Sequence, residues 1–177
     1  MSLHNNKEAV GFRWIFTIKY NSDRTIEKYK VRLVAKGFTQ TYGIDYQETF
    51  APVAKLNTIR VLFSLVANLD WPLSQMDVKN TFLNGKLEEK VYMEVPLGFK
   101  DERASGKVCK LKKALYGLKQ SPRAWFDRFT RFVKSLGYTQ AQSDHTLFFK
   151  HSSNKVAILI VYVDDIIITG NDSVETE

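Results

Sequence analysis

Cysteine and histidine are scarce in this sequence of 177 residues, which has one cysteine, Cys109, and three histidines. A single cysteine cannot form an internal disulfide, and the histidines have no spacing that suits a zinc ion. These absences exclude a disulfide-stapled scaffold and a Cys/His zinc module. We therefore expect a protein of a reducing, intracellular setting.

Long apolar segments are also missing. The N-terminal residues MSLHNNKEAV lack the apolar centre of a signal peptide, and the longest apolar run, residues 156–163, is too short to cross a bilayer. We expect no secretion and no membrane partner. The expected location is intracellular and cytoplasmic.

Positive charge is in excess, and it is unevenly distributed. The formal net charge is +7, and 44% hydrophobic with 25% charged residues is an ordinary globular composition. Residues 7–36 carry +5 and residues 103–134 carry +9, whereas residues 37–102 carry −3 and residues 135–177 carry −4. Two basic segments favour a protein that grips phosphate backbones. The alternative is that these lysines and arginines only solvate exposed faces.

Hydrophobic periodicity predicts strands and helices in a mixed order. Residues 12–20 and 28–35 alternate apolar and polar positions around the turn-rich NSDRT, which indicates a basic hairpin. Residues 55–69 repeat apolar side chains at helical spacing. A second helix is predicted from Ser121-Pro122, with serine as the cap and proline at the first helical position.

Several short apolar segments predict the remaining strands. LSQMDV at residues 73–78 is interpreted as an inner strand that ends at Asp77, and residues 90–95 and 107–111 as two further strands. Residues 156–163 and 166–170 flank a two-residue polar break and predict a hairpin with Asp164 and Asp165 at its tip. An α+β fold follows.

The adjacent carboxylates at the predicted hairpin tip are unusual, because strands disfavour aspartate and like charges side by side repel. A hard divalent cation would relieve that repulsion, and Asp77 at the end of a neighbouring strand could complete a shared cluster. The alternative is a simple polar turn, since aspartate is a favoured turn residue. These residues alone leave both interpretations open.

Four blocks in a fixed order add to this pattern. They are KYKVRLVAKGFTQTYGIDYQETFAPVAK at residues 28–55, LSQMDVKNTFLNG at 73–85, LYGLKQSPRAWF at 115–126, and Tyr162-Val163-Asp164-Asp165. The last block is similar to the YxDD signature of reverse transcriptases. The amino-acid sequences of all four blocks resemble those of the Ty1/copia class of LTR retrotransposons.

This resemblance covers residues 10–172, with stubs at residues 1–9 and 173–177. It implies a reverse transcriptase palm, a ferredoxin-like β-α-β-β-α-β sheet with helices on one face, preceded by β-rich fingers. It also implies that the parts following the YxDD hairpin in the family, namely the primer grip, thumb, connection and RNase H, are absent from this sequence.

The family pattern assigns Asp77, Asp164 and Asp165 as catalytic carboxylates, with the backbone carbonyl of Val78 as a further metal ligand. The implied cofactor is a pair of Mg²⁺ ions, with Mn²⁺ as a substitute. In this pattern Asp165 contributes less to metal contact than Asp164. The implied reaction transfers a nucleotide from a dNTP to a primer 3′-hydroxyl on an RNA or DNA template.

The resemblance also assigns binding roles. Lys30, Arg32, Phe82, Tyr116 and Gly117 are the implied nucleotide-binding residues, and Arg32 comes before Lys30, Lys19 and Lys36 as the candidate for the triphosphate. Phe82 is the implied gate against ribonucleotides, with a core position as its alternative, and stacking is the expected contact of Tyr116. The implied template and primer contacts are Ser121, Pro122, Arg123 and Tyr162.

Two classes of function follow from the resemblance. The first is an RNA-directed DNA polymerase domain that works with template-primer, dNTP and other segments of a Pol polyprotein, in cytoplasmic particles with access to the nucleus. The second is a catalytically silent, nucleic-acid-binding remnant of a transposon Pol protein. The sequence does not determine the oligomeric state.

Overall fold

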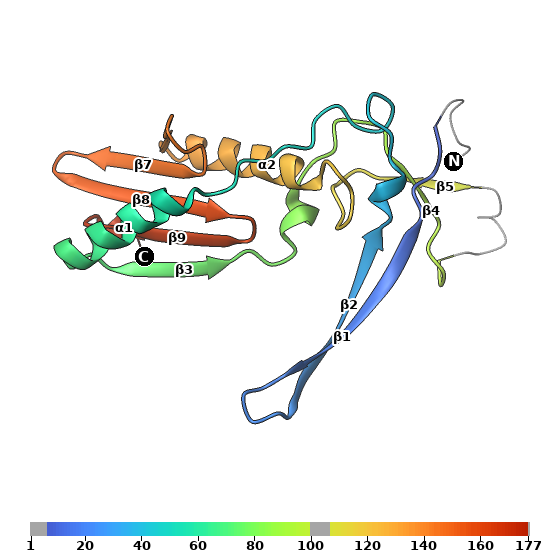
Figure 1. Ribbon diagram of the computed structural model, residues 1–177, viewed down its shortest axis with the longest axis horizontal. Coiled ribbons are helices and arrows are strands. Elements are labelled where there is room, and N and C mark those ends of the chain that lie inside the picture. The colour runs from blue at the N-terminus through green and yellow to red at the C-terminus, as the bar shows by residue number, and fades with distance from the viewer. Residues whose placement is uncertain (1–6, 100–106, 177) are drawn as a thin grey trace. The chain divides into compact units, whose positions relative to one another are not determined.

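A computed structural model of the protein describes residues 7–99 and 107–176. The chain divides into two compact units, one formed by residues 1–49 and 82–124 and the other by residues 50–81 and 125–177. The first is called unit 1 and the second unit 2 below, and each is described by itself. Both contain helical and extended segments, so the mixed α+β class is confirmed (Figure 1).

Unit 1 begins with a long antiparallel hairpin of β1, Phe12–Tyr20, and β2, Ile26–Ala35. Both predicted strands are confirmed, and β2 begins two residues earlier than expected. The turn between them closes through the Asp23 carboxylate, which accepts hydrogen bonds from the Thr25 N–H at 2.9 Å and its hydroxyl at 2.6 Å. This is the local bonding that makes aspartate a turn residue.

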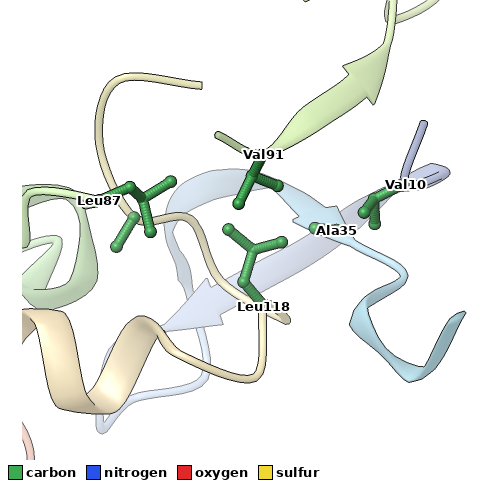
Figure 2. Packing of buried hydrophobic residues seen from close by; sticks show 6 residues of the cluster. Val10, Ala35, Leu87, Val91 and Leu118 are labelled. Carbon is green, nitrogen blue, oxygen red and sulfur yellow. The ribbon is translucent and has the colours of Figure 1, made fainter. Parts of the chain in front are cut away.

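The rest of unit 1 is built from short elements around a small apolar core. β4, Tyr92–Glu94, pairs antiparallel with β5, Val108–Lys110, so both strands expected here are confirmed with shorter bounds. One-turn helices lie at Gly37–Thr39 and at Thr81–Asn84, and the first residue of the latter, Thr81, is assigned to unit 2. Figure 2 shows the core cluster, which consists of Val10, Ala35, Leu87, Val91, Ala114 and Leu118.

Unit 2 contains a five-stranded antiparallel sheet with the strand order β3-β9-β8-β7-β6. Its strands are β3, Leu73–Asp77; β6, Thr139–Gln140; β7, Leu147–Ser152; β8, Lys155–Tyr162; and β9, Asp165–Gly170. The predicted C-terminal hairpin is confirmed as β8 and β9, but its two-residue turn is Val163-Asp164 and not Asp164-Asp165, because Asp165 pairs with Tyr162 as the first residue of β9. β6 and β7 were not among the strands predicted from the sequence.

β3 is an edge strand, so the expectation of an inner strand at residues 73–78 is wrong. Among the strands that the structure describes, it pairs with β9 alone, and all five of its residues are exposed, including Leu73 at 48% and Met76 at 46%. Apolar content alone does not distinguish an edge strand from an inner one, because the neighbours that cover a strand come from elsewhere in the chain.

Three helices complete the described chain. They are α1, Leu56–Leu69; α2, Ser121–Ser135; and α3, Ser173–Thr176. The Phe129 ring of α2 meets the Phe148 ring of β7 edge to face, with centroids 5.8 Å apart, so α2 packs on the sheet of unit 2. Within residues 7–99 and 107–176, no helix combines the length and apolar character needed to cross a membrane.

Ser121 differs from the expected helix cap. It lies within α2, and its buried hydroxyl pairs with the backbone of Leu115, donating to the carbonyl at 2.7 Å and accepting from the N–H at 3.2 Å. Serine and proline still mark the start of this helix. The serine ties it to the preceding loop instead of capping it.

Candidate active site

The tip of the β8–β9 hairpin carries the adjacent aspartates. Tyr162 pairs with Asp165, which leaves Val163 and Asp164 as a two-residue turn. Val163 has a φ of +56°, a strained value for a β-branched residue. The Trp125 indole N–H of α2 donates to the Val163 carbonyl at 2.8 Å, which helps to hold the turn in this conformation.

Asp77 lies beside this tip because β3 runs antiparallel to β9. Asp77 is the direct cross-strand partner of Asp165, and the Val78 N–H donates to the Asp164 carbonyl at 2.8 Å just beyond the end of the ladder. Directly paired residues project from the same face of a sheet. The backbone therefore places Asp77, Asp165 and Tyr162 on one face, with Asp164 in the adjoining turn.

Two further hydrogen bonds engage groups at this tip. Gln75, on the same face of β3, donates from its amide to an Asp165 carboxylate oxygen at 3.0 Å. The Val78 carbonyl, which is the expected fourth ligand, accepts a hydrogen bond from the Thr81 hydroxyl at 2.5 Å. A carbonyl oxygen has a second lone pair, so this bond is compatible with a metal ligand.

The backbone brings the residues of the expected metal site to one tip, but their side chains do not converge. Among the residues that the structure describes, no three His, Cys, Asp or Glu side chains converge to hold a metal ion. Three carboxylates and a carbonyl are nevertheless the hard oxygen donors that Mg²⁺ takes, and Asp77 is exposed while Asp164 and Asp165 are half-buried. The donor chemistry fits Mg²⁺.

Three of the five expected nucleotide-binding residues meet in unit 1. The Arg32 guanidinium lies 5.7 Å from the centre of the Tyr116 ring, and that ring meets Phe82 edge to face at 4.8 Å. Lys30 lies two residues before Arg32 on β2 and projects from the same face. The family blocks that supplied these residues come from three separate parts of the sequence.

The structure requires glycine at position 117 for a local reason. Its φ is +91°, and a Cβ atom on it would lie 2.1 Å from the carbonyl oxygen of Ala35. Next to it, the Ala35 N–H donates to the Tyr116 carbonyl at 2.8 Å. The glycine therefore allows the loop that carries Tyr116 to lie directly against the end of β2.

A buried amide pair that the sequence analysis did not identify supports the same loop. Gln40 and Gln120 are 4% and 2% exposed, and the Gln40 side-chain amide donates to the Oε1 atom of the Gln120 side chain at 3.0 Å. Gln40 also accepts from the Lys119 N–H at 2.9 Å, and Gln120 donates to the Asp45 carbonyl at 3.1 Å. Neither charge nor periodicity marks these glutamines in the sequence.

The four expected template and primer residues do not form one group within a unit. Ser121, Pro122 and Arg123 form the first turn of α2 in unit 1, where Ser121 is fully buried and bonded to Leu115. Tyr162 belongs to unit 2 and is 51% exposed beside the aspartates. Their contacts with template and primer stay predictions.

Comparison with known proteins is consistent with these blocks. The family model described as "Reverse transcriptase (RNA-dependent DNA polymerase)" matches residues 1–177. The retrovirus-related Pol polyprotein from transposon RE1 of Arabidopsis thaliana is 50% identical over 92% of the chain, and that from transposon TNT 1-94 of Nicotiana tabacum is 46% identical over 97%. The Ty1-H Gag-Pol polyprotein of Saccharomyces cerevisiae is 28% identical over 94%.

The aligned segments are a small part of these relatives. The chain spans 11% of the RE1 polyprotein, 13% of the TNT 1-94 polyprotein and 9% of the Ty1-H polyprotein. No solved structure matches the chain.

Proposed function

Since the chain belongs to the reverse transcriptase family, in its Ty1/copia retrotransposon branch, we propose that it carries the nucleotidyl transfer site of an RNA-directed DNA polymerase. In this proposal, unit 2 is a palm of the ferredoxin-like type and unit 1 belongs to the fingers. The primer 3′-hydroxyl attacks the α-phosphorus of a dNTP on an RNA or DNA template, and pyrophosphate leaves.

The observation that carries this proposal is the register between β3 and β9. It pairs Asp77 with Asp165 and ties Val78 to Asp164, so two sequence blocks far apart in the chain supply carboxylates to one tip. A polar turn would explain Asp164 and Asp165 by themselves. It would not explain a third aspartate at the end of the neighbouring strand.

In the proposed site, Asp77, Asp164 and Asp165 with the Val78 carbonyl would hold two Mg²⁺ ions, for which Mn²⁺ can substitute. The metal ions supply Lewis acidity toward the primer hydroxyl and the triphosphate. The Gln75 amide orients the Asp165 carboxylate through its 3.0 Å hydrogen bond. Because that bond engages one carboxylate oxygen of Asp165, we assign the larger share of metal binding to Asp77 and Asp164.

Unit 1 would bind the incoming nucleotide. Arg32 and Lys30 offer cations for the triphosphate oxygens. Tyr116 offers a ring face for stacking and Phe82 the bulk that excludes a ribose 2′-hydroxyl, and the 4.8 Å ring contact fixes Phe82 against Tyr116. Ser121, Pro122, Arg123 and Tyr162 are assigned to template and primer, with the burial of Ser121 favouring an indirect role.

The proposed partners are template-primer, dNTP and the other segments of a Pol polyprotein, since the plant relatives are named as Pol polyproteins. The proposed location is a cytoplasmic particle with access to the nucleus. A second function is a silent nucleic-acid-binding remnant. The observation in its favour is that no three acidic side chains converge on a metal position in the described parts of the chain.

Primer extension separates the two functions. The chain is incubated with an RNA template, an annealed DNA primer, dNTPs and Mg²⁺ or Mn²⁺, and Asp77→Asn is compared with Asp70→Asn. Asp70 follows α1 in the left-handed conformation that asparagine tolerates, so Asp70→Asn makes the same charge change without strain. The polymerase proposal predicts loss of extension on the order of 10³-fold in Asp77→Asn alone. Absence of extension by the unaltered chain, together with salt-dependent binding that is indifferent to Asp77, would establish the remnant.

A further inference from the structure

The β1–β2 hairpin has two chemically distinct faces. Its register pairs Arg13 with Val34, Ile15 with Arg32, Thr17 with Lys30 and Lys19 with Lys28. Because side chains alternate across a strand, these residues share one face. That face, called the basic face, carries five cations: Arg13, Lys19, Lys28, Lys30 and Arg32.

The opposite face, called the apolar face, has no charged residue at its paired positions. It consists of the pairs Phe12–Ala35, Trp14–Leu33, Phe16–Val31, Ile18–Tyr29 and Tyr20–Ile26. A register shift between Lys19 and Tyr20 places Glu27 at the bulge, outside these pairs. Ten apolar or aromatic residues on one face are the pattern of a sheet that packs against another surface.

Only the base of the apolar face is covered within unit 1. Ala35 is 4% exposed and belongs to the apolar core with Val10 and Leu118 (Figure 2). Further along the hairpin the exposure rises sharply. The exposed members are Phe16 at 74%, Ile18 at 42%, Tyr20 at 58%, Ile26 at 50%, Tyr29 at 73% and Val31 at 51%. The outer part of this face lacks the cover that its composition predicts.

The size of the exposed area matches a protein interface. Six side chains of this size and exposure present roughly 700 to 800 Å² of surface, because a buried aromatic residue alone covers about 150 to 250 Å². This exceeds the apolar patch of about 300 to 600 Å² that is the largest on a typical monomer. It equals the share of about 800 Å² that one partner contributes to a standard interface.

We infer that the apolar face is a self-association surface, which packs against the same face of a second copy of this chain. The distribution of charge favours this occupant. The chain carries a net charge of +7, and the five cations on the paired strands of the hairpin all project from the other face, so contact through the apolar faces keeps these cations of two copies apart. An anionic partner would be drawn to the basic face instead.

The test is the mass of residues 1–177 in solution, measured by sedimentation equilibrium after nuclease treatment. Concentrations from about 1 to about 100 µM bracket the micromolar dissociation constants of modest interfaces. The inference predicts a monomer–dimer equilibrium that raised salt strengthens, because salt screens the repulsion between the cations. In the double variant Phe16→Ser with Tyr29→Ser, the dissociation constant should rise at least about tenfold.

The matched control is Lys19→Ser with Lys28→Ser, which changes two exposed residues of the same hairpin on the basic face. The inference predicts that this control dimerises at least as strongly as the unaltered chain. Circular dichroism confirms that both double variants keep their fold. A monomer at every concentration, a dimer that nuclease treatment removes, or a dimer that survives Phe16→Ser with Tyr29→Ser would each overturn the inference. Neither polymerase activity nor metal binding enters this measurement.

Discussion

Asp144 binds the backbone of Lys55, the residue that precedes α1 and lies 89 residues earlier in the sequence. It is 2% exposed, and one carboxylate oxygen accepts the Lys55 N–H at 2.9 Å, immediately before α1. The other oxygen accepts the Thr146 N–H at 3.0 Å and the Thr146 hydroxyl at 2.7 Å. Burial alone would raise the pKa of Asp144, but the hydrogen bonds from Thr146, Lys55 and Thr58 outweigh it, so the pKa is lowered.

We predict that Asp144→Ala lowers the free energy of unfolding by about 2 to 4 kcal/mol at neutral pH, because buried donors lose a charged acceptor. Because the pKa of Asp144 is lowered in the folded state, its carboxylate stabilises the fold at any pH above the unfolded-state pKa of about 3.9. This stabilisation is lost as the pH falls through the folded-state pKa. Urea unfolding should therefore show that the difference in free energy of unfolding between Asp144→Ala and the unaltered chain becomes smaller below about pH 4. An equal gap at neutral and acid pH would contradict this assignment.

At this scale the sequence identifies residues that belong to a motif and misses those defined by distant partners. Asp77, Asp164 and Asp165 could be selected because each lies beside a recognisable apolar strand or within a family block. Asp144, Gln40 and Gln120 could not, since each of them has a partner 75 to 89 residues away. A buried polar side chain is defined by those partners, and local periodicity contains no information about them.

The loop that carries Tyr116 depends on close backbone contact with β2. We predict that Gly117→Ala destabilises unit 1 by more than about 3 kcal/mol, because the new Cβ would lie 2.1 Å from the Ala35 carbonyl oxygen at a φ of +91°. The neighbour is backbone and cannot turn aside. Urea unfolding followed by Trp fluorescence measures the loss.

Gly43→Ala is the matched control for this glycine. Gly43 has a φ of +82°, yet a Cβ atom there would meet no other atom within 4 Å. It therefore isolates the backbone strain, expected at about 1 kcal/mol, from the steric clash. Equal destabilisation by both substitutions would mean that the contact with Ala35 contributes nothing.

Among the elements, those with a strong local pattern were predicted and those defined by pairing were not. The alternation of β1 and β2, the periodicity of α1 and α2 and the break between β8 and β9 are properties of contiguous residues. The edge position of β3 is set by β9, and β6 has only two residues, so it becomes a strand through its pairing with β7. The hairpin was predicted as basic with alternating apolar positions, and the register shows that the apolar positions of both strands lie on one face.

At the scale of the whole molecule, the open question is whether the cations of the basic segments contact nucleic-acid phosphates or only solvate exposed faces. If the segment at residues 103–134 contacts phosphates, the affinity for a single-stranded oligonucleotide should fall steeply with salt, with a logarithmic slope of about −0.7 per phosphate contacted. The double variant Arg128→Gln with Lys134→Gln, which changes two exposed side chains of α2, should flatten the slope by about 1 to 1.5.

The control for this measurement is Lys79→Gln, an exposed residue of the acidic segment, which should leave the slope almost unchanged. Fluorescence anisotropy over a salt series gives the slope for each variant. A slope that does not respond to the α2 substitutions would assign those cations to solvation. The family is recognisable from the sequence because the four blocks occur in a fixed order, which no single block could indicate.

The most direct test of the proposed active site is a Mn²⁺ titration followed by the electron paramagnetic resonance signal of the free ion. It uses the chain with a saturating dNTP, and the dNTP alone as the blank. The account predicts protein-dependent binding that Asp77→Asn weakens at least about tenfold and Asp70→Asn leaves unchanged. Binding of equal strength in all three chains, or no binding beyond the blank, would contradict the claim that Asp77, Asp164 and Asp165 form a metal site.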